Sequence, residues 1–266
     1  MSAPLLSLQD LSVTFRGDGV RTRAVKSLSL DIAAGETVAL VGESGSGKSV
    51  SALASLGLLP DNAEQGGSVV WKGAEIDRGD AAAMRRLRGN EIGMIFQEPM
   101  TSLNPLHTIE KQIGESLRQH QGMSVEAARA RTLDLLNRVG IPGAETRLAS
   151  YPHELSGGQR QRVMIAMALA NNPDMLIADE PTTALDVTIE AQILDLLADL
   201  KRAEGLSMLF ITHDLGVVRQ IADRVFVMRQ GELVESADAA SLFAAPRETY
   251  TRDLIAAQPQ GIRPPE

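Results

Sequence analysis

The sequence contains no cysteine. A chain without thiols forms no disulfides, no thiolate zinc site and no cysteine-ligated iron–sulfur cluster. It also has no apolar run that reaches the roughly 18 residues of a membrane-spanning helix. Residues 1–4 lack the basic region and the long apolar core of a signal peptide. We therefore expect any connection to a membrane to come through a partner chain.

Positive charge is also in short supply. The formal net charge is −8, from 26 Lys and Arg against 34 Asp and Glu. This balance argues against a protein that coats nucleic acid, and we expect no nucleic-acid partner. The content of 44% hydrophobic and 23% charged residues is typical of a globular protein, and 266 residues suffice for one α/β domain with an inserted subdomain.

Residues 42–49 read G-x-x-x-x-G-K-S between a strand-like run, Thr37–Val41, and a helical segment of small residues. In that context the glycines turn backbone N–H groups inward to bind phosphate, and the following helix adds the positive end of its dipole. Lys48 is expected to reach the β- and γ-phosphates, and Ser49 to ligate Mg²⁺. A glycine-rich turn that only connects strand to helix is the alternative, which the full spacing and flanks disfavour. The predicted nucleotide contacts are Gly42, Glu43, Ser44, Gly45, Ser46, Gly47, Lys48, Ser49 and Val50.

Two adjacent acids follow a second apolar run, residues 175–178. Asp179 is placed to hold Mg²⁺, and Glu180 to accept a proton from water that attacks the γ-phosphate. A strand that leaves the core at two solvated acids would look the same. The phosphate loop in the same chain favours the catalytic interpretation.

Hydrophobic patterns outline the remaining chain. Alternating apolar residues predict two strands over residues 6–15 and 28–32, and Lys72-Gly73 predicts a hairpin turn. Residues 108–140 have helical periodicity and no strand signal, which predicts an inserted helical subdomain. Glycines at 140 and 205 are expected helix stops, and residues 250–257 form a further helical candidate. Alternating strands and helices elsewhere imply a mostly parallel sheet.

Leu155-Ser156-Gly157-Gly158-Gln159, before a long helical run, closely resembles the signature motif of ATP-binding cassette (ABC) ATPases. Other motifs of that family follow in order. Phe15 matches the aromatic residue that stacks on adenine, and Gln97 matches the Q-loop glutamine. Residues 181–186 resemble the D-loop, and His213 matches the switch histidine. The resemblance covers about residues 5–235.

The resemblance implies a P-loop NTPase fold of the α/β class, with a RecA-like, mostly parallel core. An N-terminal antiparallel β subdomain and a helical subdomain at about residues 100–165 complete the expected cassette, residues 1–235. Residues 236–266 are then a C-terminal extension or linker, and Pro264 and Pro265 suggest a linker or free end.

For function, the resemblance implies two cassettes packed head to tail, with ATP between the phosphate loop of one and the signature motif of the other. It assigns ATP contacts to Phe15, Gln97, Ser156, Gly157, Gly158 and Gln159. It assigns Mg²⁺ to Ser49, Gln97 and Asp179, and catalysis to Glu180 and His213. The second cassette is a second copy, a paralogous subunit or a fused half. Two transmembrane permease subunits and a periplasmic or extracellular substrate-binding protein are further expected partners, at the cytoplasmic face of the inner membrane.

The ATPases of oligopeptide, dipeptide and nickel importers are resembled most in four segments: residues 96–105, 151–155, 243–246 and 250–251. Within that group the chain is most similar to the first cassette of tandem ATPases of microcin C and oligopeptide importers. The expected function is therefore ATP hydrolysis that energises import of peptides or peptide-like compounds, with nickel or glutathione import as the alternative. A soluble ABC ATPase of DNA repair is disfavoured because residues 50–155 lack sustained heptads. A translation factor is disfavoured by the acidic charge. The sequence leaves open whether this is a whole subunit or one cassette of a longer chain.

The loop at residues 99–105 is the expected contact with the membrane partner. Two prolines restrain it, and Met100 and Leu103 are expected to offer apolar contact. In the alternative, both side chains fold inward and the loop is a connector.

Overall fold

The computed structural model describes residues 3–17, 19–183 and 185–257. The chain forms two compact units: Met1–Arg78 with Ser207–Glu266, and Gly79–Leu206. Asp18 lies outside the described residues. The end of the predicted C-terminal extension, with Pro264 and Pro265, also lies outside them.

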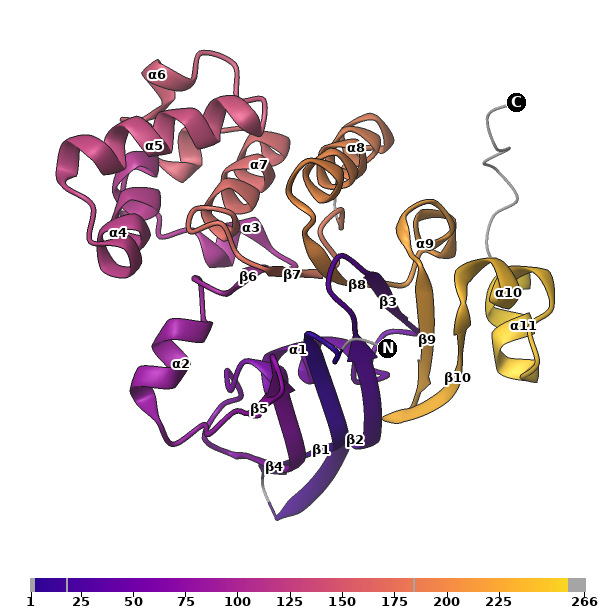
Figure 1. Cartoon of the computed structure of the whole chain (residues 1–266). Helices are drawn as coiled ribbons and strands as arrows, with labels where there is room; N and C mark the ends of the chain where they lie inside the picture. The colour runs from indigo at the N-terminus through magenta and orange to yellow at the C-terminus, as the bar shows by residue number, and fades with distance from the viewer. Residues whose placement is uncertain (1–2, 18, 184, 258–266) are drawn as a thin grey trace. The chain divides into compact units, whose positions relative to one another are not determined.

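The first unit contains strands in the order β5-β4-β1-β2-β10-β9-β3-β8 (Figure 1). Their bounds are β1 Leu6–Gly17, β2 Val20–Ile32, β3 Thr37–Val41, β4 Ala63–Trp71, β5 Ala74–Glu75, β8 Ser207–Thr212, β9 Arg224–Arg229 and β10 Glu232–Asp238. Strands β1, β2, β4 and β5 pair antiparallel, whereas β3 pairs in parallel with β8 and β9. The predicted antiparallel N-terminal strands and parallel core strands are both confirmed.

Local sequence explains how these strands form. In β1 the buried residues alternate, and the alternation shifts at Asp10, where the register with β2 and β4 slips and φ is +48°. This is a β-bulge, which keeps Leu8 and Leu11 on the buried face. The predicted hairpin turn is confirmed, with Lys72 at φ +48° and Gly73 at φ +80° between β4 and β5.

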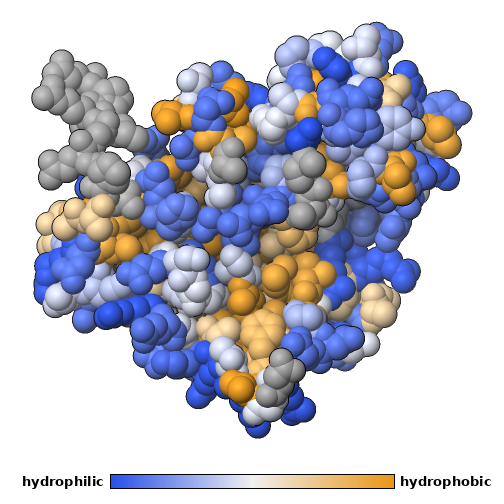
Figure 2. All heavy atoms as spheres, turned by 180° about the vertical axis from the view of Figure 1, so that it is seen from behind, coloured by the Kyte–Doolittle hydropathy of each residue, from blue (hydrophilic) through white to orange (hydrophobic). Residues whose placement is uncertain are grey.

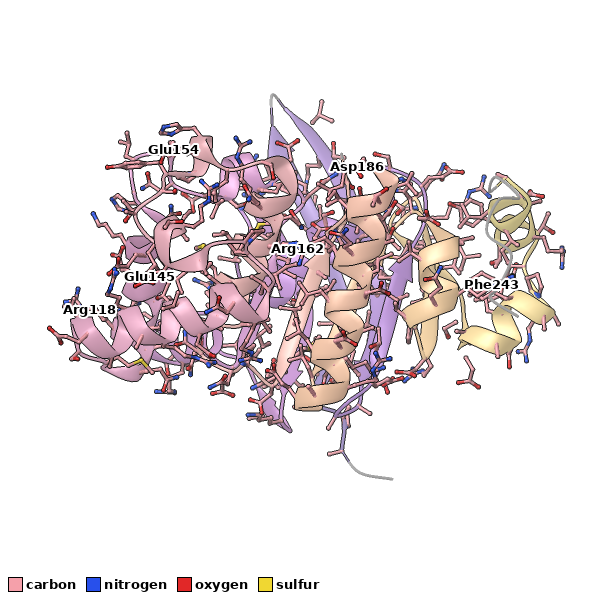
Figure 3. The ribbon with its side chains drawn as sticks, turned by 90° about the horizontal axis from the view of Figure 1, so that it is seen from above. Arg118, Glu145, Glu154, Arg162, Asp186 and Phe243 are labelled. Atoms are coloured by element: carbon pink, nitrogen blue, oxygen red, sulfur yellow. The ribbon has the colours of Figure 1, made fainter. Side chains whose placement is uncertain are left out.

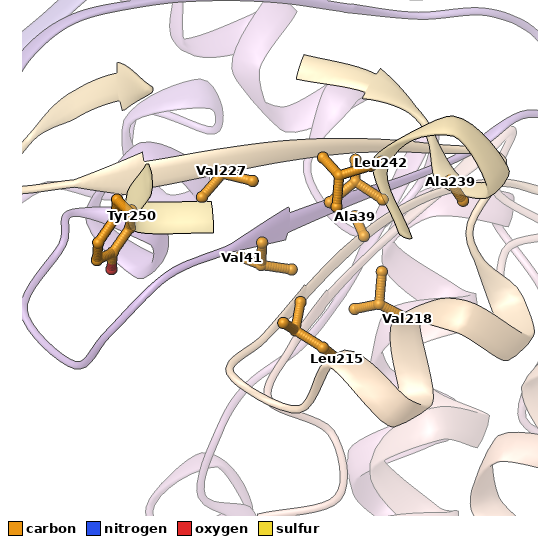
Figure 4. Close-up of a cluster of buried hydrophobic side chains, with 9 residues drawn as sticks. Ala39, Val41, Leu215, Val218, Val227, Ala239, Leu242 and Tyr250 are labelled. Carbon is orange, nitrogen blue, oxygen red and sulfur yellow. The ribbon is translucent and has the colours of Figure 1, made fainter. Parts of the chain in front are cut away.

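Among its described residues this unit has the helices α1 Lys48–Ser55, α9 Leu215–Ile221, α10 Ala239–Ala244 and α11 Thr249–Ala256. Helix α11 confirms the predicted helical candidate, whereas α10 and β10 were not predicted. Side chains from β3, α9, β9, α10 and α11 form one buried apolar cluster (Figure 4). Its members are Ala39, Val41, Leu215, Val218, Val225, Val227, Ala239, Leu242 and Tyr250.

The second unit contains the parallel strands β6 Ile92–Ile95 and β7 Met175–Asp179. Its helices are α2 Ala81–Leu87, α3 Pro99–Ser102, α4 Ile109–Gln121, α5 Val125–Arg138, α6 Ala144–Arg147, η1 Pro152–Glu154 (a 3-10 helix), α7 Gly157–Ala168 and α8 Val187–Glu204. Gly140 follows α5 at φ +73°, and Gly205 ends α8 at φ +65°, so both predicted helix stops are confirmed.

Helix α7 contacts α4 and α5 and also packs on β6. Arg162 of α7 donates to the Val139 carbonyl at the end of α5 and, at 3.0 Å, to Gln192 Oε1 of α8 (Figure 3). These contacts fix the axis of α7, and with it the direction in which its N-terminus points. Within the described residues, no helix combines the length and the apolar character needed to span a bilayer.

A buried carboxylate holds the start of α11. Glu235 of β10 is 8% exposed and accepts the backbone N–H groups of Arg247 at 2.9 Å and Glu248 at 3.1 Å. Glu248 caps α11 without a side-chain hydrogen bond, so the Glu235 carboxylate serves in its place. Burial raises the pKa of the Glu235 carboxyl, but the Thr251 side chain and these two N–H groups favour the ionised form and lower it overall.

We predict that Glu235→Gln lowers the free energy of unfolding by about 2 kcal/mol at pH 7, because two hydrogen bonds lose their charged acceptor. The folded-state pKa of Glu235 lies below its usual value. Its stabilisation is therefore complete above the unfolded-state pKa, about 4.3, and is lost as the pH falls through the lower folded-state pKa. The difference between variant and wild type should shrink below about pH 4.3 in denaturant titrations.

Glu232→Gln is the matched control, since Glu232 lies on the same strand, is exposed, and pairs with Lys26 at 3.2 Å. A surface pair of this kind contributes about 0.5 kcal/mol. Equal losses in the two variants would contradict the role given to Glu235.

Candidate functional site

The glycine-rich loop lies between the buried strand β3 and helix α1 in the first unit. Gly42 has φ +151°, and a Cβ there would lie 2.2 Å from the Met228 carbonyl oxygen. Gly47 has φ +104°, and a Cβ there would lie 2.6 Å from the Ala24 carbonyl oxygen. Both neighbours are backbone atoms, so only glycine fits at these two positions.

Lys48, the first residue of α1, is 5% exposed and turns back over the loop. Its ammonium donates to the carbonyl oxygens of Gly42 at 2.7 Å and Glu43 at 2.9 Å, and lies 3.5 Å from Ser46 Oγ. Helix α1 carries no acid in its first turn. The loop therefore combines a buried cation with the positive end of a helix, an arrangement suited to phosphate.

The two predicted acids lie at the end of β7 in the second unit. Asp179 is 5% exposed, and Glu180 follows it with φ +45°, a backbone region that residues other than glycine rarely adopt. Glu180 Oε2 accepts Gln97 Nε2 at 3.2 Å and Thr183 Oγ1 at 2.8 Å. Strands β6 and β7 pair in parallel with Ile95 opposite Ala178, so their carboxyl ends bring Gln97 to Glu180.

Thr183 is a contact of the acidic group that the sequence did not reveal. It lies in the predicted D-loop, and its N–H also donates to the Glu180 carbonyl at 3.1 Å. The available signal was the spacing, because a Thr three residues after an acid in a turn can bond back to that acid. Spacing alone could not distinguish Thr183 from Thr182.

The signature residues form the start of α7. Ser156 is the N-cap: its Oγ accepts the Gln159 N–H at 3.3 Å, and Gln159 Oε1 accepts the Ser156 N–H at 3.0 Å. This capping box fixes the first turn. Ser156 and Gly157 are exposed, Gly158 and Gln159 are half-buried, and the first turn contains no acid. The end of the helix is thus open to an anion.

The other predicted residues lie in the first unit. His213 is exposed directly after β8, beside Asp214, which caps α9. Phe15 is half-buried in β1, opposite Thr22 of β2 and Ala63 of β4. The first unit thus contains Phe15, residues 42–50 and His213. The second contains Gln97, residues 156–159, Asp179 and Glu180.

The chemistry of the predicted metal ligands fits Mg²⁺. The hydroxyl of Ser49, the amide oxygen of Gln97 and the carboxylate of Asp179 are hard oxygen donors. The Gln97 amide nitrogen donates to Glu180, so its oxygen is the atom suited to a metal. In the part of the chain that the structure describes, no three His, Cys, Asp or Glu residues gather as a metal site. Mg²⁺ needs no such cage when phosphate and water supply most of its ligands.

The predicted orientation of Leu103 is wrong. Leu103 is only 2% exposed, and buried Gln112 holds the next residue, accepting the Asn104 N–H at 2.9 Å and donating to its carbonyl at 3.1 Å. The side chain of Met100 lies outside the described part of the chain. Exposed apolar side chains are found instead at Leu106, 81% exposed, and Phe96, 37% exposed. Apolar areas of the surface are visible in Figure 2.

Comparison with known proteins gives one consistent picture. A family model described as "ABC transporter" matches residues 25–183. The chain is 60% identical to the peptidoglycan transport ATP-binding protein YejF of Agrobacterium fabrum, over 98% of the chain and 48% of that protein. It is 52% identical to a Brucella ovis ATP-binding protein named for peptide import, over 97% of the chain and 78% of that protein. It is 51% identical to the glutathione import ATP-binding protein GsiA of Escherichia coli, over 96% of the chain and 42% of that protein.

Solved structures agree on the fold. A dimeric post-hydrolysis state of the ATP-binding cassette MJ0796, bound to ADP and Pi, matches with a TM-score of 0.77 and 31% identity, over 88% of this chain and 98% of that one. A second match, cbiO1 from Clostridium perfringens, has a TM-score of 0.76 and 28% identity over 92% of each chain. The chain spans about half the length of YejF and GsiA.

The loop geometry yields a matched pair of variants. Gly47→Ala should lower the free energy of unfolding by about 2 kcal/mol more than Gly45→Ala, because only at Gly47 does the new Cβ meet backbone. Gly45 also has positive φ, +79°, but nothing lies within 4 Å of a Cβ there. Thermal unfolding measures the difference, about 4–8 °C. Equal melting temperatures would show that positive φ alone, and not the contact with Ala24, demands glycine.

Proposed function

The chain belongs to the ABC transporter family, and on that premise we propose that it is the ATP-hydrolysing cassette of a bacterial importer of peptides or peptide-like compounds. The observation that carries the proposal is the phosphate loop, where Lys48 is buried against the Gly42 and Glu43 carbonyls beside an acid-free helix start. Such a loop binds a nucleoside triphosphate through N–H groups and one fixed cation.

Nucleotide and metal follow from the same residues. Phe15 would stack on adenine, and residues 42–50 would bind the phosphates. Ser49, Gln97 and Asp179 would hold Mg²⁺, which neutralises phosphate charge when bound. The similar MJ0796 cassette, solved with ADP and Pi bound, supports ATP as the nucleotide.

Hydrolysis needs a base that takes a proton from the attacking water. We assign this role to Glu180 and the positioning of the γ-phosphate to His213. Glu180 has a rare backbone conformation, and two side chains bind one of its carboxylate oxygens. Both features restrict the carboxylate to one orientation, which general-base catalysis requires.

The proposed partners follow from the exposed signature helix. Ser156 and Gly157 open the N-terminus of α7, and in the proposal that end binds the ATP of a second cassette together with Gly158 and Gln159. The second cassette is another copy, a paralogous subunit or a fused half, and the 48% coverage of YejF leaves room for the fused half. Two permease subunits would hold the pair at the cytoplasmic face of the inner membrane, with a substrate-binding protein outside.

The cargo proposal rests on the relatives' names, which give peptidoglycan transport, peptide import and glutathione import. Peptide bonds are common to peptides, glutathione and the stem of peptidoglycan. We therefore propose cargo that contains a short peptide. Nickel has no such support among these relatives.

Glu180→Gln tests the proposed function. The amide keeps the shape of the side chain but accepts no proton, so ATP turnover should fall by about 10²–10⁴-fold while ATP still binds. Because ATP then persists, a nucleotide-dependent dimer should accumulate in size-exclusion chromatography with MgATP. Lys48→Ala is the contrasting variant and should lose ATP binding by at least about tenfold in calorimetry. Hydrolysis at the wild-type rate in Glu180→Gln would refute the assigned base.

Leu106→Glu tests the permease contact. Leu106 is 81% exposed, so the charge should leave the melting temperature within about 2 °C of wild type. If residues around Leu106 dock on the permease, assembly and peptide uptake in reconstituted membranes should fall. Leu103→Glu, three residues away and buried, should instead destabilise the isolated chain by at least about 3 kcal/mol. Full uptake with Leu106→Glu would locate the permease contact elsewhere.

A further inference from the structure

One residue of the phosphate loop is held at both ends of its backbone. The Glu43 N–H donates to the Tyr250 hydroxyl at 3.3 Å, and the Glu43 carbonyl accepts the Lys48 ammonium at 2.9 Å. Tyr250 belongs to α11, 207 positions further along the chain. A side chain near the described C-terminal end thus touches the residue that also orients the phosphate-binding lysine.

The position of Tyr250 is fixed by its surroundings. The residue is 9% exposed and belongs to the apolar cluster that includes Val41 and Val227. The Arg229 guanidinium lies 4.7 Å from its ring centroid. In Figure 4 the hydroxyl of Tyr250 points to the loop that continues from Val41. A buried tyrosine needs a partner for its hydroxyl, and here that partner is a backbone N–H of the loop.

Two neighbouring contacts show that this part of the chain supports the loop more broadly. The Gly231 N–H, in the turn between β9 and β10, donates to the Ser46 carbonyl at 3.0 Å. Glu235 accepts the N–H groups of the two residues directly before α11 and so helps to position Tyr250. Hydrogen bonds from the β9–β10 turn and from α11 therefore reach two residues of the loop, Ser46 and Glu43.

We propose that Tyr250 is a positioning residue for nucleotide binding: its hydroxyl fixes the Glu43 peptide and thereby the place of the Lys48 ammonium. Helix α11 then belongs functionally to the nucleotide-binding unit. A purely structural tyrosine would act through its ring alone, and phenylalanine would replace it without loss. This inference rests on the proposed function, in which the loop binds the phosphates of ATP.

The test is Tyr250→Phe in the full chain, because this variant removes only the hydroxyl. The Kd for ATP in calorimetry should rise about three- to fivefold, the factor that corresponds to one neutral hydrogen bond. The KM for ATP should rise with kcat unchanged, since the interaction acts on binding and not on the chemical step. The amides of residues 42–44 should also exchange hydrogen faster than in wild type.

Phe243→Leu is the matched control. Phe243 of α10 packs against the same cluster under the Arg219 guanidinium, 4.6 Å from its ring centroid, at the position labelled in Figure 3. This substitution should lower the melting temperature and leave the Kd for ATP at the wild-type value. Tyr250→Phe should instead raise the Kd for ATP and leave the melting temperature close to that of wild type.

Three results are decisive. Equal Kd values for wild type and Tyr250→Phe would overturn the inference. A parallel rise of Kd in Phe243→Leu would overturn it too, because general loosening of α10 and α11 would then explain both. Failure of the wild-type chain to bind ATP would instead refute the proposed function.

Discussion

The phosphate loop, residues 42–49, must keep one backbone shape around the buried Lys48 ammonium, and the first unit is built around that constraint. Lys48 has lost nearly all contact with water and binds carbonyl oxygens of its own loop, so the loop must keep one shape for the charge to remain satisfied. The parallel strands β8 and β9 flank β3 and hold the start of the loop. The Met228 and Ala24 carbonyls close in on Gly42 and Gly47, leaving no room for side chains. Sheet, glycines and lysine thus serve a single backbone geometry.

The second unit meets a similar requirement by different means. Glu180 keeps its carboxylate oriented through a backbone conformation that costs about 1–3 kcal/mol and persists only where the surroundings enforce it. The turn formed by the Thr183 N–H, together with the side chains of Thr183 and Gln97, supplies that enforcement. Gln97 also follows β6, which leads into α3 and the helices beyond. One side-chain hydrogen bond thus joins the acid to the segment between β6 and α3.

Sequence could predict the features that short-range chemistry determines. Particular residues at fixed spacing define the loop at residues 42–49, the helix that follows Ser156, the Lys72-Gly73 turn and the stop at Gly205, and all lie where expected. Spacing could not tell that Leu103 is buried and Leu106 exposed. The two leucines lie three positions apart around Pro105, and the Gln112 side chain that binds the backbone of Asn104 comes from eight positions further along the chain.

Contacts between residues far apart in the sequence could not be predicted either, because local spacing does not encode them. Tyr250 and Glu43 meet because β3, β9 and α11 share a buried cluster, and no local pattern encodes that meeting. No sequence motif marks Glu235, because the two N–H groups that it accepts belong to Arg247 and Glu248, 12 and 13 positions further along the chain. Such residues look ordinary until the fold supplies their partners.

The two helices proposed to face phosphate have no acid in their first turns, although the chain has a net charge of −8. Helices α4, α5 and α8 each carry an acid in the first turn, at Glu110, Glu126 and Glu190, where it stabilises the helix by neutralising the positive end of the dipole. Helices α1 and α7 carry none. Helices α2, α3, α9, α10 and α11 also have no acid there. What distinguishes α1 is the buried Lys48 beside its start, and what distinguishes α7 is its exposed N-cap, Ser156. Lys48 and the start of α1 supply positive charge at the proposed phosphate loop. Screening by salt limits the field of distant acids to about 10 Å, so the net charge of the chain does not by itself oppose binding there.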